Sequence, residues 1–205
     1  MWSSEVTNMI ITGIWETLYM TLVSTLVGYV IGLPMGIILT VSDKDGIKPN
    51  AVLYKILDVI ANIVRSVPFI ILLVLLIPFT RLVVGKSYGS TATIVPLVIA
   101  AAPYIARMVE SSLKEVDAGV IEAARSMGAS NFTIITKVML VEARTSLLVG
   151  ATITLGTILG YSAMSGAVGG GGLGAIAIRY GYTRWQTDIM IVTVILLIIL
   201  FQIFQ

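Results

Sequence analysis

Five apolar stretches of this chain are each long enough to cross the hydrocarbon core of a bilayer. They cover residues 17–41, 56–84, 90–108, 146–168 and 188–205, and the second is interrupted by Asp58, Arg65 and Arg81. A membrane-spanning helix needs about 20 mostly apolar residues. We therefore predict an all-α membrane protein in which residues 1–205 form one domain of five transmembrane helices. Because the last stretch reaches Gln205 without a polar anchor, we expect the natural chain to continue further.

The composition supports the bilayer as solvent and excludes several kinds of chemistry. Hydrophobic residues make up 57% of the chain and charged residues only 12%, against about 25% charged residues in soluble domains. The chain has no His and no Cys, which removes disulfides, thiol nucleophiles, imidazole bases and most zinc or haem sites. We expect no catalytic residue, metal or cofactor here, and the absence of a basic tract argues against nucleic acid as a partner.

The basic residues are divided unequally between the loops. Eight Lys and Arg residues lie in the first and third loops between spans, and four lie in the second and fourth: Lys44, Lys48, Lys55, Arg107, Lys114, Arg125, Lys137 and Arg144 against Arg81, Lys86, Arg179 and Arg184. Cytoplasmic loops carry the excess of Lys and Arg. The tally predicts an N-terminus outside and a C-terminus inside.

Small residues and prolines indicate helices that pack closely and bend. Gly28, Gly32 and Gly36 recur every four residues, so they form one stripe on the first predicted helix. Such a stripe packs either against another helix of the same chain or against another subunit. Pro34, Pro68, Pro78, Pro96 and Pro103 each remove a helix hydrogen bond. In a bilayer such breaks require neighbours or a water-filled path, which favours a bent bundle around a pathway.

A polar segment, residues 114–144, separates the third and fourth predicted spans. It contains four basic and four acidic residues. Asp117 can cap a short helix that passes through Glu122 to Met127, and Gly128 can stop it. Ser130 can cap a second helix, on which Phe132, Ile135 and Met139 would form one apolar face. Spacing alone does not decide between an ordered loop without a partner and a projection that docks into another protein.

The centre of this segment resembles the signature of permease subunits of bacterial ABC importers. That signature reads Glu-Ala-Ala, three residues, Gly, nine residues, Ile, one residue, Leu-Pro. Here Glu122-Ala123-Ala124 is followed at the same distances by Gly128, by Val138 in place of Ile, and by Leu140, whereas Val141 stands where the family has Pro. The resemblance implies a coupling helix that docks on a separate ATPase, with Glu122, Ala123, Ala124, Arg125, Met127 and Gly128 at the contact. The missing Pro leaves open how the chain turns into the fourth span.

Three further segments narrow the resemblance to permeases of methionine uptake importers: residues 62–73, 102–110 and 160–174. The resemblance covers nearly the whole chain. It implies a permease, not an enzyme, that imports D- or L-methionine across the bacterial inner membrane. It also implies a homodimer, two ATPase subunits that bind ATP and Mg, an extracytoplasmic methionine-binding protein, and contact with membrane lipid.

Two residues of the fourth span are candidates for the transport pathway. Tyr161 and Met164 could line it, because a methionine side chain suits both a thioether substrate and a hydrophobic gate. Met is equally a good core filler, so packing stays open as the alternative. Arg65, near the cytoplasmic end of the second span, is expected to extend its charge to water or to make a contact in gating.

Two glycine motifs mimic nucleotide sites. Gly85-Lys86-Ser87 resembles the end of a phosphate-binding loop, but Thr80 replaces the required earlier glycine and a membrane span precedes it. The glycines of residues 169–174 match a dinucleotide pattern, but no βαβ unit surrounds them. A flexible outer loop or a re-entrant turn is the better interpretation.

Other functions remain open as alternatives. They are an ABC permease for another small polar amino acid or metabolite, and an ATP-independent channel or secondary carrier. We find no internal repeat and no carboxylate in the cores of the first, third or fourth predicted spans, which argues against a carrier. An intramembrane enzyme would need a reactive pair inside the spans, and none is evident.

Overall fold

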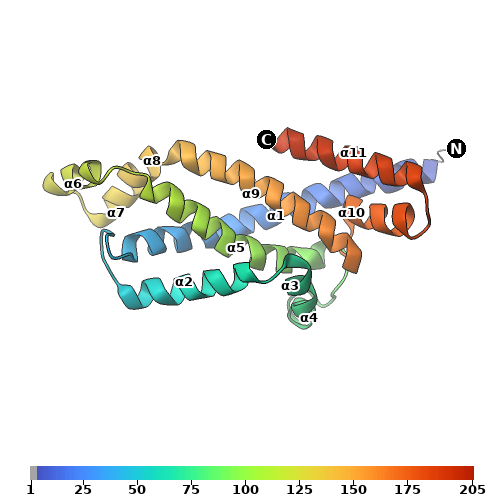
Figure 1. The fold of residues 1–205 in the computed structure, drawn as a ribbon, viewed down its shortest axis with the longest axis horizontal. Coiled ribbons are helices and arrows are strands. Elements are labelled where there is room, and N and C mark those ends of the chain that lie inside the picture. Colours follow the sequence, from blue (N-terminus) through green and yellow to red (C-terminus); the bar gives the residue numbers. More distant parts are fainter. Residues whose placement is uncertain (1–3) are drawn as a thin grey trace. The chain divides into compact units, whose positions relative to one another are not determined.

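The computed structural model describes residues 4–205, and every regular element in that part of the chain is a helix (Figure 1). In chain order the elements are α1 (Ser4–Ser42), α2 (Ala51–Ser66), α3 (Phe69–Leu75), α4 (Ile77–Val84), α5 (Ser90–Lys114), α6 (Ala118–Ser126), α7 (Asn131–Thr133), the π-helix η1 (Ile134–Met139), α8 (Leu140–Glu142), α9 (Arg144–Ser165), the 3₁₀ turn η2 (Gly166–Val168), α10 (Gly172–Ile176), the π-helix η3 (Ala177–Tyr182) and α11 (Thr187–Phe204). The predicted all-α class is confirmed.

Four helical segments of residues 4–205 are long and apolar enough to cross a membrane, or five if the broken pair α2 and α3 counts as one. The second predicted span, residues 56–84, is divided between α2, α3 and α4, and its break at Pro68 agrees with the predicted proline bends. The chain leaves the helix at Val67 and Pro68, where proline disfavours the helical conformation for the residue before it. A second break at Leu76 precedes α4, whose first turn contains Pro78, a position where a missing N–H costs nothing.

The chain forms two compact units. Unit 1 comprises Met1–Val27, Val67–Ala101 and Thr154–Gln205, and unit 2 comprises Gly28–Ser66 and Ala102–Ile153. Helices α1, α5 and α9 each contribute residues to both units.

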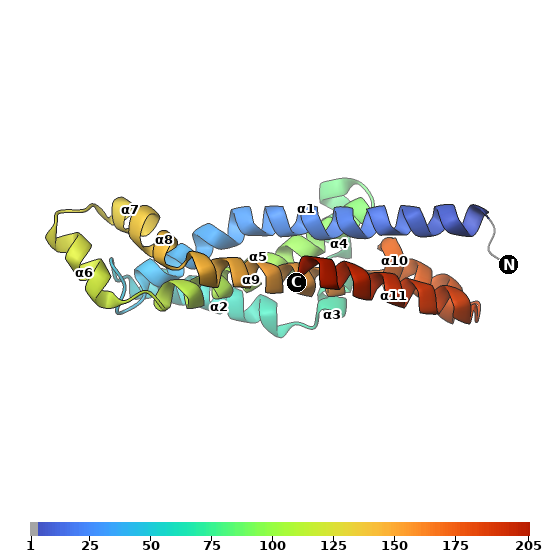
Figure 2. The ribbon, with the colours of Figure 1, turned by 90° about the horizontal axis from the view of Figure 1, so that it is seen from above.

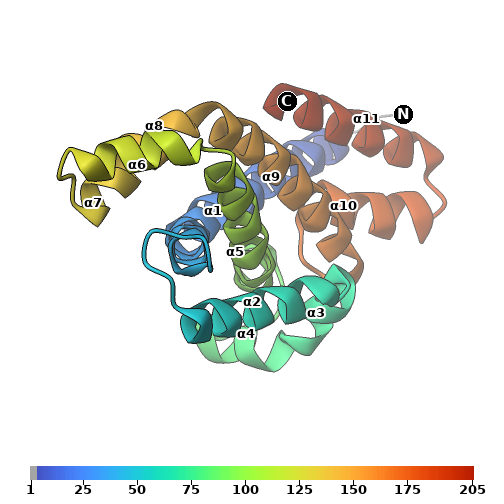
Figure 3. The same ribbon diagram turned by 60° about the vertical axis from the view of Figure 1, so that its left-hand side comes forward.

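Unit 1 has its own apolar core. It is built from Ile10, Leu159, Leu173, Ile176, Ile189 and Leu200. Helices α10 and α11 lie side by side in this unit, with η3 also against α11 (Figure 3). Outside the core, large apolar side chains such as Leu26, Leu82 and Ile203 are strongly exposed. Exposed apolar surface on this scale marks an interaction site or a lipid-facing surface, and lipid fits helices of this hydropathy.

Unit 2 is held by close contact between α1 and α5. Gly28, Gly32 and Gly36 are all buried. A Cβ placed on Gly32 would lie 2.6 Å from the carbonyl oxygen of Ala102, and one on Gly36 would lie 2.6 Å from that of Ala106. The glycine stripe therefore packs inside the chain at Gly32 and Gly36, the first of the two alternatives that the sequence left open.

Helix α5 is longer than the third predicted span and ends at Lys114 instead of Met108. Arg107 and Lys114, which we predicted to lie in a loop, are therefore on the last two turns of α5. Beyond its end, α6 and α7 project past the C-terminal end of α1 (Figure 2).

Candidate functional site

The projection begins with α6, whose two ends are fixed as the sequence predicted. The Asp117 carboxylate caps the helix and accepts a hydrogen bond from the Gly119 N–H at 2.7 Å. At the other end Gly128 has φ +82°. The Gly128 N–H donates to the Arg125 carbonyl and the Ala129 N–H to the Ala124 carbonyl, the paired bonds of a Schellman stop. A nine-residue helix closed at both ends is a rigid element.

The candidate docking residues divide between the two faces of α6. Ala124 is buried, and the other five are exposed: Glu122, Ala123, Arg125, Met127 and Gly128. Met127 is 82% exposed, so its apolar side chain is not covered by the described part of the chain. The exposed set is therefore available to a partner, while Ala124 allows the helix to lie close to its own unit.

The segment after α6 differs in part from the prediction. Ser130 caps α7, since its hydroxyl oxygen accepts a hydrogen bond from the Thr133 N–H at 3.2 Å. The apolar face through Phe132 was wrong, because Phe132 is 75% exposed whereas Ile134 and Met139 are buried. The chain is a π-helix over Ile134–Met139, and its wider turn brings residues five apart onto one face.

At the start of the fourth span the helix is only slightly interrupted. Ala143, with φ −77° and ψ 1°, separates α8 from α9, and the bonds from the Ala143 N–H to the Met139 carbonyl and from the Leu147 N–H to the Ala143 carbonyl continue across it. Val141, which stands in place of Pro, keeps the backbone N–H that a proline would lack.

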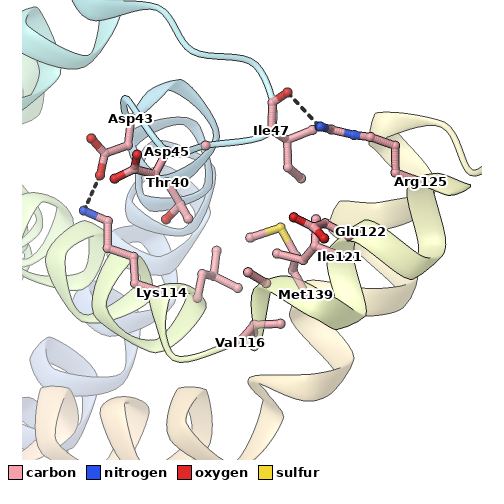
Figure 4. A pocket seen from close by; sticks show the side chains of 13 residues that line it. Thr40, Asp43, Asp45, Ile47, Lys114, Val116, Ile121, Glu122, Arg125 and Met139 are labelled. Carbon is pink, nitrogen blue, oxygen red and sulfur yellow. Dashed lines mark hydrogen bonds and ion pairs between the residues drawn. The ribbon is translucent and has the colours of Figure 1, made fainter.

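A cavity of about 510 Å³ lies between α6, the end of α5 and the loop that follows α1 (Figure 4). Arg125 reaches across from α6 and donates a hydrogen bond to the Ile47 carbonyl at 3.0 Å. Arg125 therefore binds the loop, and no ion pair joins it to Glu122 in the described chain. Glu122 also lines the cavity, so its carboxylate stays available to a partner.

A network of five alternating charges lies beside this cavity and was not predicted. Lys114 contacts Asp43 at 2.7 Å and Glu110 at 2.8 Å, Glu110 contacts Arg107 at 2.7 Å, and Arg107 pairs with Asp58. The hydrogen bond from the Lys114 ammonium holds the pKa of the Asp43 carboxyl below its usual value, although burial opposes this shift. The network joins the end of α1, α2 and α5. Its signal in the sequence was the spacing of Arg107, Glu110 and Lys114, which are three and four residues apart and share a helix face.

Arg65 stands apart from this network. It is exposed in the last turn of α2, whereas Asp58 of the same helix pairs with Arg107. The exposure agrees with a charge that reaches polar surroundings, and a role in gating stays a prediction.

The candidate pathway residues both lie near the C-terminal end of α9, in unit 1. The ring of Tyr161 stacks on that of Phe69 of α3, with centroids 4.5 Å apart and planes 4° from parallel. Met164 is 52% exposed. Tyr161 therefore has a packing partner within the unit, while the side chain of Met164 is not a core filler of this chain.

The two glycine motifs are structural. Gly85 ends α4 in the left-handed conformation, and no strand precedes it within residues 4–205. Glycines 169–172 do not form a flexible loop. They form a turn between η2 and α10 that hydrogen bonds fix to α1, to the start of α5 and to the end of α9.

Comparison with known proteins agrees with this architecture. Residues 32–205 match the family model described as a binding-protein-dependent transport system inner membrane component. The probable D-methionine transport system permease protein MetI of Vibrio cholerae is 50% identical over 204 residues, which cover 100% of this chain and 91% of that protein. The D-methionine transport system permease protein MetI of Escherichia coli K12 is 53% identical over 158 residues, or 77% of this chain and 73% of that one.

Solved structures give the same result. A structure of inward-facing conformations of the MetNI methionine ABC transporter matches with a TM-score of 0.97 and 51% identity, over 100% of this chain and 94% of the other. An amino acid ABC transporter crystallised with histidines shares the fold alone, with a TM-score of 0.79 at 23% identity over 98% and 91% of the two chains. The chain therefore belongs to the family of binding-protein-dependent transport system inner membrane components.

Proposed function

We propose that this chain is the permease subunit of an ATP-driven importer that moves methionine, as the D or the L isomer, across the bacterial inner membrane. One observation carries the proposal. A short helix closed at both ends, α6, presents Glu122, Arg125 and Met127 between α5 and α9, in a chain that matches a MetNI methionine transporter chain along its whole length at 51% identity.

The proposed assembly supplies what this chain lacks. Its Gly85-Lys86-Ser87 string is a helix stop, so ATP and Mg bind in two separate ATPase subunits. Two copies of the permease form a homodimer in membrane lipid, and a methionine-binding protein delivers substrate from outside. The chain itself is a translocation subunit and does no chemistry.

Helix α6 acts as the coupling lever. Arg125 fixes it to the Ile47 carbonyl, and the charge network ties the neighbouring Lys114 to Asp43 and Glu110. A partner that moves α6 therefore also moves the ends of α1 and α5 in unit 2. The permease has two arrangements of its helices, and ATP binding to the ATPase favours one of them because the contacts with α6 differ between the two.

The pathway passes the end of α9. Met164, which is half exposed, offers a polarisable thioether to the apolar thioether side chain of methionine. The stack of Tyr161 on Phe69 holds the neighbouring turn of α9 in place. The loop tally predicts that the C-terminal end of α9 faces outside, with the N-terminus outside and the C-terminus inside.

Reconstitution into liposomes tests the proposal. With a MetN-type ATPase, a methionine-binding protein and ATP, the vesicles should accumulate radiolabelled methionine, whereas vesicles that hold the permease alone should not. Uptake by the permease alone would make the chain a channel or carrier. Unlabelled D-methionine, L-methionine and small polar amino acids, added as competitors, identify the substrate, and competition by a polar amino acid but not by methionine would contradict the methionine assignment.

A further inference from the structure

The glycine turn before α10 is capped by side chains from α1. The Gly172 N–H donates a hydrogen bond to Glu16 Oε2 at 2.7 Å, and the Leu173 N–H donates to Thr17 Oγ1 at 2.9 Å. The first N–H groups of a helix have no partner within the helix. Here two of them are satisfied by residues 156 positions earlier in the chain.

Glycine is required in this turn for two separate reasons. Gly171 and Gly172 have φ of +90° and +72°, which side chains disfavour. A Cβ on Gly171 would also lie 2.9 Å from Glu16 Oε2, and one on Gly172 would lie 2.7 Å from Thr17 Oγ1. The backbone of the turn can therefore approach α1 this closely only because Gly171 and Gly172 have no side chains.

The opposite side of the turn is bound as well. The Gly89 N–H donates to the Gly169 carbonyl at 2.9 Å, and the Thr93 hydroxyl donates to the Gly170 carbonyl at 3.2 Å. The Gly170 N–H donates to the Ser165 carbonyl at 2.9 Å, at the last residue of α9. Three elements of unit 1, α1, α5 and α9, thus meet at this turn.

Glu16 is the charged side chain that binds the turn, and Glu5 and Arg179 line the cavity beside it. Glu16 lies half-buried on α1, one residue before the first apolar stretch, and a carboxylate that is partly removed from water is costly unless it is hydrogen-bonded. Its bond to the Gly172 N–H is charge-assisted, and such bonds are roughly twice as strong as neutral ones. The negative charge also complements the positive end of the α10 dipole.

From this geometry we infer that Glu16 is a positioning residue for transport. Its carboxylate holds the glycine turn, and the turn holds the end of α9 that carries Tyr161 and Met164. The inference rests on the proposed function for the role of these two residues. Without the Glu16 carboxylate the turn loses its charge-assisted contact with α1 and keeps only neutral hydrogen bonds, so the end of α9 is held less firmly.

Transport by the assembled complex gives the first test. We expect Glu16→Ala to lower methionine uptake per complex about tenfold and Glu16→Gln, which keeps a neutral acceptor, about threefold. ATPase co-purification should stay at the wild-type level in both, because α6 belongs to unit 2. Glu5→Gln is the matched control: Glu5 is exposed on the same helix and lines the same cavity as Glu16, and its uptake should not change.

A second readout needs neither substrate nor ATPase. The chain has no Cys, so Met164→Cys introduces a single thiol at the end of α9. In purified permease, Glu16→Ala and Glu16→Gln should raise the rate at which a maleimide labels this thiol several-fold, and Glu5→Gln should leave it unchanged. If the wild-type complex moves no methionine, the proposed function fails, and labelling alone then decides on Glu16.

Two results would overturn the inference. One is wild-type uptake per complex in Glu16→Ala. The other is a labelling rate at position 164 that is the same with Glu16, Ala or Gln at position 16. If Glu16→Ala does not fold, Glu16→Gln serves alone, and wild-type values in both of its assays contradict the role of the charge.

Discussion

At the scale of single residues, the α1–α5 contact in unit 2 depends on the absence of a Cβ. Gly32 lies so close to α5 that an added Cβ would be 2.6 Å from the Ala102 carbonyl oxygen and 2.7 Å from Ile105 Cβ. Backbone atoms cannot move aside as the end of a side chain can. In membranes the hydrophobic effect does not drive helices together, because lipid tails are as apolar as the helices. Small residues stabilise helix pairs there by letting the two backbones pack closely.

Gly32→Ala should therefore destabilise the protein, although alanine is the better helix former. Overpacking costs about 1–3 kcal/mol, which outweighs the helix-propensity gain of about 1 kcal/mol. Gly160→Ala is the matched control, since Gly160 is also helical and a Cβ there meets nothing within 4 Å. Thermal unfolding in detergent should show a lower Tm for Gly32→Ala and an equal or higher Tm for Gly160→Ala. Equal shifts in the two variants would contradict the packing argument.

At this scale the sequence predicted those features in which residue spacing alone puts side chains on one helix face. The stripe of Gly28, Gly32 and Gly36 was visible as a four-residue repeat, but its partner helix could not be read from it. Glu16 was missed for a different reason. Its acceptor role depends on a turn 156 residues away, and no local pattern records a contact of that separation.

At the scale of elements, α6 was the best-predicted part of the chain. Its cap at Asp117 and stop at Gly128 are local devices, so their residues indicate them directly. The π-helix η1 was not predicted, and Phe132 was therefore placed on the wrong face. A π-turn depends on tertiary packing of residues such as Ile134 and Met139, and its five-residue spacing does not stand out from a helical pattern.

Gly128→Ala should weaken docking of the ATPase. The left-handed conformation costs a non-glycine residue about 1–2 kcal/mol, so the end of α6 should shift or fray. Gly85→Ala is a close control, because Gly85 ends α4 with φ +81° and, like Gly128, has open space around its Cβ position. Both variants should lose similar stability, but only Gly128→Ala should reduce the ATPase that co-purifies with the permease. Equal loss of ATPase in the two variants would remove α6 from the docking site.

The charge network should contribute far more to stability than the surface pair beside it. Arg107→Met leaves Asp58 without its ion-pair partner and Glu110 with Lys114 alone. Because Asp58 is 30% exposed, the loss should stay below the roughly 3–5 kcal/mol of a fully buried pair. Lys44→Met breaks a 3.7 Å pair with Asp45 whose side chains are more than four-fifths exposed, and such pairs contribute at most about 1 kcal/mol. Denaturation of the purified permease should separate the two variants clearly. Comparable losses would mean that the network is not a structural link between α1, α2 and α5.

At the scale of the whole molecule, the number of crossings decides the topology. Residues 4–205 contain four helical segments that are long and apolar enough to span a bilayer, and the pair α2 and α3 makes a fifth only if it crosses as one. An odd number of crossings puts the two ends of the chain on opposite sides. The sequence could not decide this, because apolar length over residues 56–84 is the same whether the chain crosses or turns back at Pro68.

The distribution of Lys and Arg predicts that this broken segment crosses. The loop after α1 contains Lys44 and Lys48, and the third loop between the predicted spans contains five more basic residues, so both should be cytoplasmic. In a chain without Cys, Asp45→Cys and Ser87→Cys each give a unique thiol, one on either side of α2, α3 and α4. In intact cells a membrane-impermeant maleimide should label the thiol of Ser87→Cys and not that of Asp45→Cys, and both should react after the cells are opened. Labelling of both in intact cells, or of neither, would mean that α2 and α3 form a re-entrant segment and that the N- and C-terminal ends share one side of the membrane.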